Sequence, residues 1–361
     1  MLYPLRLQER AASKPNWVGW SPTRSSSATK SRSRCCRSQA ASSSSAARRP
    51  RRNCATDEGP QVEVEVEPFW MGKCEVSWAE YMEWMNFTDR FAEPDGKLTV
   101  KVTPQNEVDA VTAPSNLYAP EFTFGLGDDP RLPAVTMSSF AARQYTRWLS
   151  LKTGQTFRLP NEIEWEYAAR AGSTTAYGFG DDATKLGEYA WTSENSEETP
   201  HFVGLKKPNA WGLYDMHGNV MEWTLDAYRA DDYAKLPTGA GLALTRWPKE
   251  LFPRTLRGGS FEFSARVARS AARFASEEEQ WRKRDPNLPR GPWWLTNDPG
   301  RSVGMRVIRT LKPLTPDEAK HAYEVDNEQT KISLEARLTD GKGARGVLGP
   351  AAKIPQVAPQ P

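Results

Sequence analysis

The chain has 361 residues, of which 38% are hydrophobic, 26% charged and 11% aromatic. This length allows one large domain or two of ordinary size, and no stretch reaches the roughly 20 apolar residues of a membrane-spanning helix. The formal net charge is +3, but residues 1–55 hold twelve Lys and Arg against one Glu, so the remaining residues carry −8. An acidic body argues against nucleic acid as the partner of the folded part, because phosphate binding needs clustered cations.

Residues 1–55 are rich in Ser, Arg and Ala and show no hydrophobic periodicity. Such a segment buries too little apolar surface to offset the entropy of ordering, which predicts a disordered tail or a wrongly assigned start of the chain. A transit peptide and a nucleic-acid-binding arm remain as alternatives, since the segment is Arg-rich and poor in acids. The localisation stays unknown, because no apolar core of a secretory signal is recognisable.

The predicted folded domain covers residues 56–311. Alternating Val and Glu over residues 62–67 predict a half-buried strand. Ser77 and Glu80 have the spacing of a capping box, so a helix is expected to start at Ser77. Two further helices are expected, one over residues 138–152 that stops at Gly154 and one that follows Asn161 and stops at Gly172.

The pattern changes after Gly172, where the helical periodicity ends and the chain is rich in Gly and Pro, with a Trp every few tens of residues. This composition predicts short strands and long loops held by buried indoles, which are more often core residues than ligand stackers. Residues 312–361 are polar and bounded by prolines. They are predicted to form an extension with one short helix near residues 316–327 and little part in the core.

Cysteine and histidine usage limits the possible metal and disulfide chemistry. Three of the four cysteines lie in the first 55 residues, which leaves Cys74 alone in the body and excludes an internal disulfide framework there. The chain has three histidines and no Cys-x-x-Cys pair. A structural zinc site is therefore not expected, and an iron site would need nearly every histidine.

Several segments, in one order, carry a family resemblance. They read LPAV at residues 132–135, FRLPNEIEWEYAAR at 157–170, PNAWGLYDMHGNVMEW at 208–223, RGGSF at 257–261 and GMRV at 304–307. Together they resemble the formylglycine-generating enzyme, or sulfatase-modifying factor, domain family over roughly residues 61–311. The resemblance implies an α+β fold like that of C-type lectins, with low regular secondary structure and long Trp-pinned loops.

The oxidase members of this family bind Cu(I) through two cysteines in the segment after Gly-Gly-Ser, and thiolates select that soft ion. The first of these positions falls on Phe263, and residues 264–274 contain no cysteine. Copper is therefore not expected, and neither is formylglycine generation. A second branch uses iron held by histidines largely from an added helical domain, which this chain lacks. His201 and His217 could in principle be two iron ligands, but His217, inside DMHGN, is predicted to be a loop residue bonded to neighbouring backbone.

The resemblance also implies a calcium site. Its ligands would be the side chains of Asp215 and Glu222 and the backbone carbonyls of Gly218 and Val220, oxygen donors of the kind that Ca²⁺ accepts. The alternative is that Asp215 caps the turn while Glu222 pairs with an arginine.

Weaker site candidates surround the Gly-Gly-Ser segment. Ser260, Phe263 and Arg257 correspond to positions near the family's substrate groove. Four arginines in this region could line a cleft for an anionic ligand or could bind loop carboxylates: Arg257, Arg266, Arg269 and Arg273. The acids of the helix after Asn161, at residues 162, 164 and 166, are not expected to form an acid/base pair, because alternate helical residues diverge.

Two functional hypotheses follow. The first is a binding module, without the copper-binding cysteines, that holds a peptide or small ligand. The second is an oxidoreductase that acts on a protein or small molecule through an unrecognised site. An aromatic and Arg-lined groove without nucleophile or redox metal would favour the first, and convergent polar groups with perturbed ionisation the second. The oligomeric state is not indicated.

Overall fold

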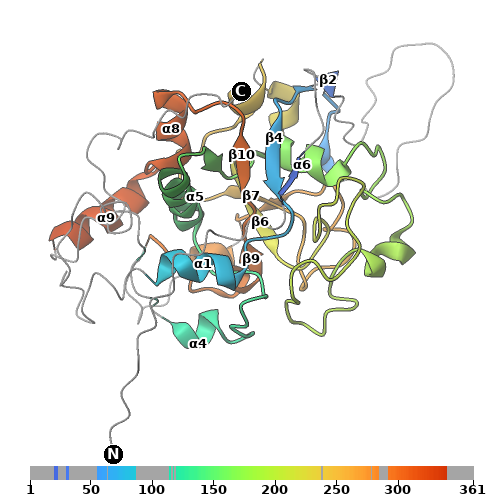
Figure 1. Cartoon of the computed structure of the whole chain (residues 1–361), viewed down its shortest axis with the longest axis horizontal. Coiled ribbons are helices and arrows are strands. Elements are labelled where there is room, and N and C mark those ends of the chain that lie inside the picture. Colours follow the sequence, from blue (N-terminus) through green and yellow to red (C-terminus); the bar gives the residue numbers. More distant parts are fainter. Residues whose placement is uncertain are drawn as a thin grey trace, which may run out of the picture.

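The computed structural model describes residues 55–62, 64–86, 114, 117, 119–236, 239–277, 279–283 and 292–339, with the backbone alone at residues 337–339 and in two short N-terminal strands. This part of the chain contains two four-stranded sheets, one two-stranded sheet and a set of helices (Figure 1). None of the described helices is both long and apolar enough to cross a membrane.

The first sheet brings distant segments of the chain together. Its order is β1 (Trp20–Pro22), β4 (Phe69–Gly72), β10 (Ile308–Thr310) and β5 (Phe157–Arg158), and all pairings are antiparallel. Residues about 240 positions apart are therefore hydrogen-bonded neighbours in β4 and β10. This sheet ties the beginning of the folded domain to its end.

The N-terminal strands differ from the prediction that residues 1–55 have no regular structure. β1 pairs with β4, and β2 (Lys30–Ser31) pairs with β3 (Val64–Glu65). An open sheet edge presents unpaired backbone groups, so an extended segment of almost any composition can pair with it. The rest of the predicted tail up to residue 54 lies outside the described residues.

The second sheet lies at the centre of the molecule. Its order is β8 (Phe274–Ala275), β7 (Arg254–Arg257), β6 (Met221–Ala227) and β9 (Val303–Gly304). All seven residues of β6 are buried, so this strand is covered on both faces. It runs antiparallel to β7 and parallel to β9.

The three predicted helices are confirmed together with their caps. Ser77 and Glu80 form a reciprocal capping box at α1 (Trp78–Met85). Ser138 caps α5 (Ser139–Thr153), which ends at Gly154 with a left-handed φ of 68°. Asn161 and Glu164 form the capping box of α6 (Glu162–Arg170), whose last turn closes at residue 171, one position before the predicted stop.

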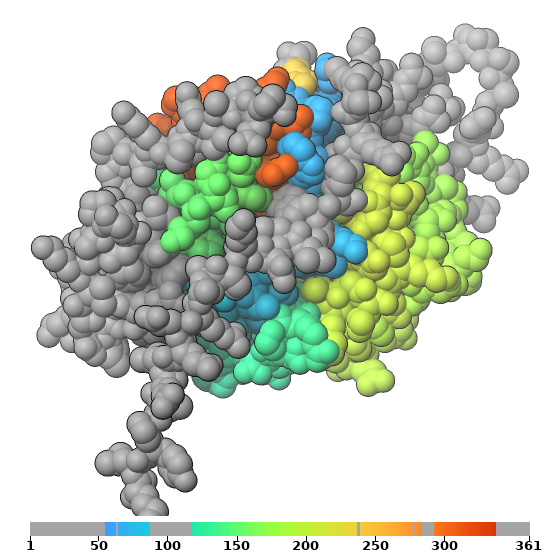
Figure 2. All heavy atoms as spheres, in the orientation of Figure 1, coloured from blue at the N-terminus to red at the C-terminus, as the bar shows by residue number. Residues whose placement is uncertain are grey.

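Short elements connect these helices and strands. The helices α4 (Pro120–Thr123) and α7 (Glu279–Arg282) have four residues each. Turns of 3₁₀ helix lie at Thr56–Glu58, Ala183–Glu188, Asp232–Lys235, Gly241–Leu244 and Asp298–Ser302. The residues between α6 and β6 form one flank of the molecule, coloured green to yellow at the right of Figure 2. The prediction of long loops and short strands after Gly172 is confirmed.

The C-terminal extension contributes to the core, so the prediction that it does not is wrong. It forms α8 (Pro316–Tyr323), as expected, and also α9 (Glu328–Thr339), and α8 lies against α5 (Figure 1). Tyr323 is buried and its hydroxyl donates to the Phe157 carbonyl at 2.6 Å. Leu334 of α9 is 1% exposed and belongs to the main hydrophobic cluster. Sparse apolar residues in a polar segment gave no periodic signal of this packing.

Buried indoles hold the interior. Six tryptophans have at most 2% of their surface exposed: Trp78, Trp84, Trp165, Trp223, Trp281 and Trp293. Several of them form edge-to-face or tilted contacts with other rings, as Trp223 does with Trp281 at 5.9 Å. The α+β fold class is confirmed by the two sheets and the packed helices, while its likeness to the C-type lectins stays a prediction.

Candidate functional site

The loop that precedes β6 is tightly packed against its neighbours. Asp215 and Asn219 adopt left-handed backbone conformations with φ of 57° and 63°. A Cβ atom at Gly218 would lie 2.2 Å from the carbonyl oxygen of Trp191, so only glycine fits there. The Asn219 backbone N–H donates to the same carbonyl at 2.8 Å. The loop geometry is therefore fixed by contacts with the segment around Trp191.

The two predicted calcium-binding carboxylates have different surroundings. Asp215 accepts a hydrogen bond from the Gly204 N–H on Oδ2 at 2.7 Å, while its buried Oδ1 has no partner. Burial raises the pKa of Asp215 to about 6. Glu222 accepts from Arg306 on both oxygens, at 2.8 to 3.1 Å, and from Trp165 Nε1 at 2.6 Å.

These contacts fit a cation at Asp215 but not at Glu222. The unpartnered Oδ1 of Asp215 is an available oxygen donor, whereas both oxygens of Glu222 are occupied by Arg306 and Trp165. Within the described part of the chain, no group of three or more His, Cys, Asp or Glu side chains is arranged to hold a metal ion. The arrangement agrees with the alternative in which Glu222 pairs with an arginine, and calcium at Asp215, Gly218, Val220 and Glu222 stays a prediction.

The histidines of this region bind backbone groups. His217 is buried, accepts from the Gly178 N–H on Nε2 at 3.0 Å and lies 2.8 Å from the Ala268 carbonyl through Nδ1. Burial lowers the pKa of His217 to about 4, so its ring is neutral and Nδ1 donates. The His201 ring stacks on Trp191 at 3.6 Å and contacts the Ser196 carbonyl. Both rings therefore serve the loop structure, as expected.

The segment after Gly-Gly-Ser holds no thiol. Phe263 is half-buried and its ring packs on Phe274 at 5.1 Å. Ser260 is 1% exposed, and its hydroxyl accepts from the Glu262 N–H at 3.2 Å. Cys74 is the last cysteine in the sequence, and burial raises the pKa of its thiol to about 12, so it stays protonated. A pair of thiolates for Cu(I) is not available here.

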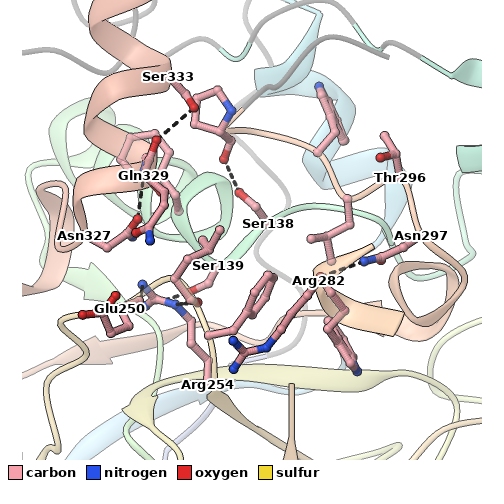
Figure 3. Close-up of a pocket in the computed structure, with 18 of the residues that line it drawn as sticks. Ser138, Ser139, Glu250, Arg254, Arg282, Thr296, Asn297, Asn327, Gln329 and Ser333 are labelled. Carbon is pink, nitrogen blue, oxygen red and sulfur yellow. Dashed lines mark hydrogen bonds between the residues drawn. The ribbon is translucent and has the colours of Figure 1, made fainter. Parts of the chain in front are cut away.

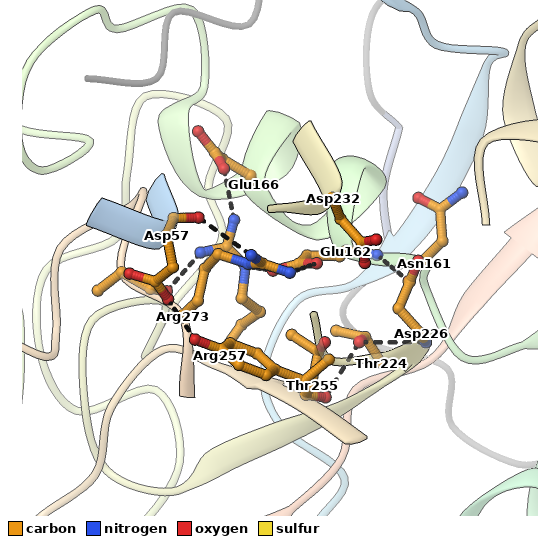
Figure 4. Close-up of polar contacts among 12 residues, drawn as sticks. Asp57, Asn161, Glu162, Glu166, Thr224, Asp226, Asp232, Thr255, Arg257 and Arg273 are labelled. Atoms are coloured by element: carbon orange, nitrogen blue, oxygen red, sulfur yellow. Dashed lines mark hydrogen bonds and ion pairs between the residues drawn. The ribbon is translucent and has the colours of Figure 1, made fainter. Parts of the chain in front are cut away.

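The arginines beside this segment bind carboxylates instead of lining a cleft (Figure 4). Arg257 is fully buried and donates to Glu166 and to the Ala272 carbonyl. Arg273 donates to Glu162 at 2.6 and 3.0 Å, and Arg246 reaches the same carboxylate. Arg269 pairs with Glu58 in the same way. The alternative in which these arginines bind carboxylates therefore holds for Arg257, Arg269 and Arg273, although the carboxylates that Arg257 and Arg273 bind belong to the helix α6 and not to a loop.

The convergence of Glu162 and Glu166 on Arg257 was not predicted. Their spacing of four residues places them on one face of α6, one turn apart, and the Arg257 Nε lies 3.4 Å from Glu162 Oε1. Surrounding arginines lower the pKa of Glu162 to about 2 against the opposing effect of burial. The four-residue spacing was the sequence signal for this pair, but the arginines that meet it come from distant strands and loops.

A cavity of about 420 Å³ opens elsewhere, between the N-terminus of α5, the β6–β7 sheet, α7 and α9 (Figure 3). Its apolar lining consists of Phe140, Trp223, Leu251, Phe252, Trp281, Pro292, Trp294 and Leu295. Its polar and charged lining consists of Ser138, Ser139, Glu250, Arg254, Arg282, Lys283, Thr296, Asn297, Asn327, Gln329, Thr330 and Ser333. None of the site residues predicted from sequence lines it.

Polar contacts fix the walls of this cavity. Arg254 donates to both oxygens of Asp326, at 2.7 and 2.9 Å, and so ties β7 to the start of α9. Asn327 accepts from the Thr330 N–H at 2.9 Å and caps that helix. Ser138, the cap of α5, donates to the Pro292 carbonyl on the opposite wall. The cavity is therefore built from segments between residues 138 and 333 that meet only in the folded state.

Thr136, two residues before this cap, has a φ of 65°, which is rare for a β-branched residue. It is fully buried, its N–H lies 3.0 Å from the Gly300 carbonyl, and its own carbonyl accepts from Leu295 at 2.7 Å. Backbone strain of this kind persists where surrounding contacts enforce it, often beside binding sites. The hydrogen bond from Leu295 to Thr136 connects the segment before α5 to the wall of the cavity.

Comparison with known proteins decides the family. Residues 39–284 match the family described as "Sulfatase-modifying factor enzyme 1-like domain". The chain belongs to this family. The match of this sulfatase-modifying-factor domain starts inside the predicted tail and ends before β10, so it differs from the predicted limits of 56–311 at both ends.

Curated relatives include formylglycine-generating enzymes. That of Streptomyces coelicolor is 35% identical over 150 residues, which cover 37% of this chain and 43% of the relative. That of Mycobacterium tuberculosis is 33% identical over 144 residues, or 36% of this chain and 46% of the relative. A third relative is the "Inactive C-alpha-formylglycine-generating enzyme 2" of Bos taurus, 33% identical over 118 residues, or 30% and 37%. The chain thus aligns with less than half the length of these relatives.

Two solved structures are also similar. PvdO from Pseudomonas aeruginosa aligns with a TM-score of 0.49 and 26% identity, covering 72% of this chain and 87% of that one. Treponema denticola variable protein 1 aligns with a TM-score of 0.47 and 20% identity, covering 70% and 88%.

Proposed function

We propose that this sulfatase-modifying-factor domain is a binding module that holds a peptide or small molecule with an apolar body in the cavity between α5, β7 and α9. The observation that carries the proposal is the aromatic lining of that cavity. Its volume of about 420 Å³ lies within the range of about 300–1,000 Å³ of small-molecule sites, which are lined mainly by apolar side chains with a few polar groups.

The composition of the lining supports binding over catalysis. The described residues that line the cavity include no cysteine, histidine or aspartate. The Ser138 hydroxyl donates to a backbone carbonyl, and the Ser139 hydroxyl lies 3.4 Å from Arg254, a cation that cannot act as a base. A serine nucleophile needs an adjacent general base, so neither serine is activated.

The alternative is an oxidoreductase that acts through an unrecognised site. Most of the named relatives are formylglycine-generating enzymes, and this sequence similarity favours the oxidoreductase. One relative is named as inactive, and the present chain has Phe263 and no later cysteine where the oxidase members need thiols. The cavity supports the binding module, because it offers apolar contact without reactive groups.

Calorimetry with 2-naphthamide, a neutral aromatic probe, tests the proposal. We expect saturable binding that is lost in Ser333→Phe, because Ser333 lines the cavity from α9 and a phenyl ring there would occupy it. The matched control is Ile332→Phe, since Ile332 is the preceding residue of α9, is 55% exposed and does not line the cavity. Binding that both variants retain, or the absence of binding by the wild type, would contradict the proposal.

A further inference from the structure

We propose that the ligand of this cavity carries a carboxylate, held by Arg282 and Lys283 at the C-terminal end of α7, with its apolar body against the aromatic wall. This inference rests on the proposed binding function and specifies the class of ligand. It follows from which of the four charged residues of the lining, Arg254, Arg282, Lys283 and Glu250, have an ion-pair partner among the described residues and which do not.

The first of these charges is satisfied within the protein. Arg254 is 3% exposed, and its guanidinium forms two hydrogen bonds with Asp326. The same guanidinium donates to the backbone carbonyls of Glu250 and Leu251 at 3.3 and 3.0 Å. A ligand anion could reach Arg254 only by displacing a buried ion pair, which is strongly unfavourable.

Arg282 and Lys283 are different, because both are exposed and their side chains have no ion pair or hydrogen bond with any described residue. Arg282 lines the cavity from α7, and Figure 3 shows its side chain extending from near Asn297 toward Arg254. A carboxylate can accept two parallel hydrogen bonds from the guanidinium of Arg282, and Lys283 adds a second positive charge to the same lining.

Glu250 sets the orientation of the ligand. It is an exposed acid without an ion pair among the described residues, and it lines the cavity from the segment before β7 (Figure 3). A carboxylate near Glu250 would be repelled, whereas near α7 it meets two cations. Phe252 and Trp281 belong to the apolar part of the same lining. The lining therefore fits a molecule with an aromatic or aliphatic body and one terminal carboxylate directed at α7.

The test compares 2-naphthoate with 2-naphthamide, which have the same ring system and differ in charge. We expect the wild type to bind the carboxylate about fivefold more tightly at low salt, as for an exposed pair of charges, with less difference at high salt. Arg282→Gln and Lys283→Gln should each lower the affinity for 2-naphthoate about threefold and leave 2-naphthamide unchanged. Glu250→Gln should tighten the binding of 2-naphthoate alone.

Lys249→Gln is the matched control, because Lys249 is an exposed lysine next to Glu250 in sequence that does not line the cavity. Equal affinity for the two probes, with no effect of the Arg282 and Lys283 variants, would overturn the inference while leaving the proposed binding function intact. If neither probe binds the wild type, the proposed function fails and the inference fails with it. Folding of each variant is checked by its melting temperature.

Discussion

Glu162 shows what a single buried charge contributes when several partners surround it. Its carboxylate accepts from Arg273 and Arg246 and lies 3.4 Å from Arg257 Nε, and Asp226 accepts from its backbone N–H at 2.6 Å. Repulsion by Glu162 and, above all, burial raise the pKa of Asp226 to about 6. The two carboxyl groups of this network therefore differ in pKa, so that Glu162 stays ionised at a pH at which Asp226 takes up a proton.

This network predicts a defined pH dependence. The folded pKa of Glu162 is lowered to about 2 from 4.5, so its contribution to stability is complete above about pH 4.5 and is lost as the pH falls toward 2. The contribution is on the order of 3 kcal/mol. Glu162→Gln should be about 3–5 kcal/mol less stable than the wild type at pH 7, and this deficit should shrink below pH 4.5. Urea unfolding at several pH values measures it.

Glu277→Gln is the control, because Glu277 is exposed and its removal should change stability by less than about 0.5 kcal/mol. A deficit of Glu162→Gln that stays constant from pH 7 to pH 3.5 would show that the arginines stabilise the fold by packing and not by charge.

Asp215 allows a second prediction at the scale of one residue. Its Oδ1 is buried without a partner, so a calcium ion bound there should stabilise the folded chain. Ligand at 100 times its dissociation constant contributes about 2.7 kcal/mol, and the gain should be smaller here because Glu222 must first leave Arg306. We expect calcium to raise the melting temperature of chelator-treated protein, and Asp215→Asn to abolish the effect.

Glu80→Gln serves as the comparison for calcium, because Glu80 belongs to the α1 capping box and lies outside the loop; it should keep the full response. An unchanged melting temperature of the wild type, with no calcium in the purified protein, would show that Glu222 serves Arg306 alone.

At the scale of elements, α9 depends on the ion pairs at its start. Asp326 pairs with Arg143 at 3.0 Å and with Arg254 at 2.7 Å, and both arginines hold the pKa of this carboxyl well below its usual range. α9 contributes the buried Leu334 and three residues of the cavity wall, Gln329, Thr330 and Ser333. This carboxylate therefore attaches the start of α9 to the domain, in addition to the buried contacts of Tyr323 and Leu334.

Asp326→Asn should loosen α9, because it leaves two buried guanidinium groups without their anion. Breaking such a pair costs about 3–5 kcal/mol, so amide exchange in residues 328–339 should accelerate about a hundredfold or more, and 2-naphthamide should bind more weakly. Hydrogen exchange read by mass spectrometry measures the first effect. Asp317→Asn is the matched control, since the Asp317 side chain is 83% exposed. Unchanged exchange in α9 would mean that Leu334 alone anchors it.

At the scale of the whole molecule, the question is whether the family's oxidase chemistry persists. We expect no conversion of a Cys-x-Pro-x-Arg peptide to formylglycine in the presence of copper and oxygen, because Phe263 and residues 264–274 supply no thiolate. Phe263→Cys should not restore activity, since linear Cu(I) ligation needs two thiolates. Mass spectrometry of the peptide reads the outcome, with the Streptomyces coelicolor relative as the positive control. Formation of formylglycine by the wild type would contradict the binding-module proposal and support the oxidoreductase alternative.

Features that depend on neighbours in the chain could be predicted from the sequence. The capping boxes at Ser77 and Asn161 and the stop at Gly154 are local, because each cap contacts a backbone group within four residues. The family could be recognised for a related reason, since its motifs are short contiguous segments. The absence of the thiol pair is equally a property of the sequence.

The ion-pair partners of the buried arginines and the position of the cavity could be found only from the way in which distant segments pack. Arg306 meets Glu222 across 84 residues of chain, and Arg254 meets Asp326 across 72. No local pattern distinguishes an arginine that will be buried against such a carboxylate from one that faces a ligand, as Arg257 and Arg282 illustrate. The reason is physical: side-chain periodicity reports which face of an element is buried, but the residue that it meets is set by how separate elements pack.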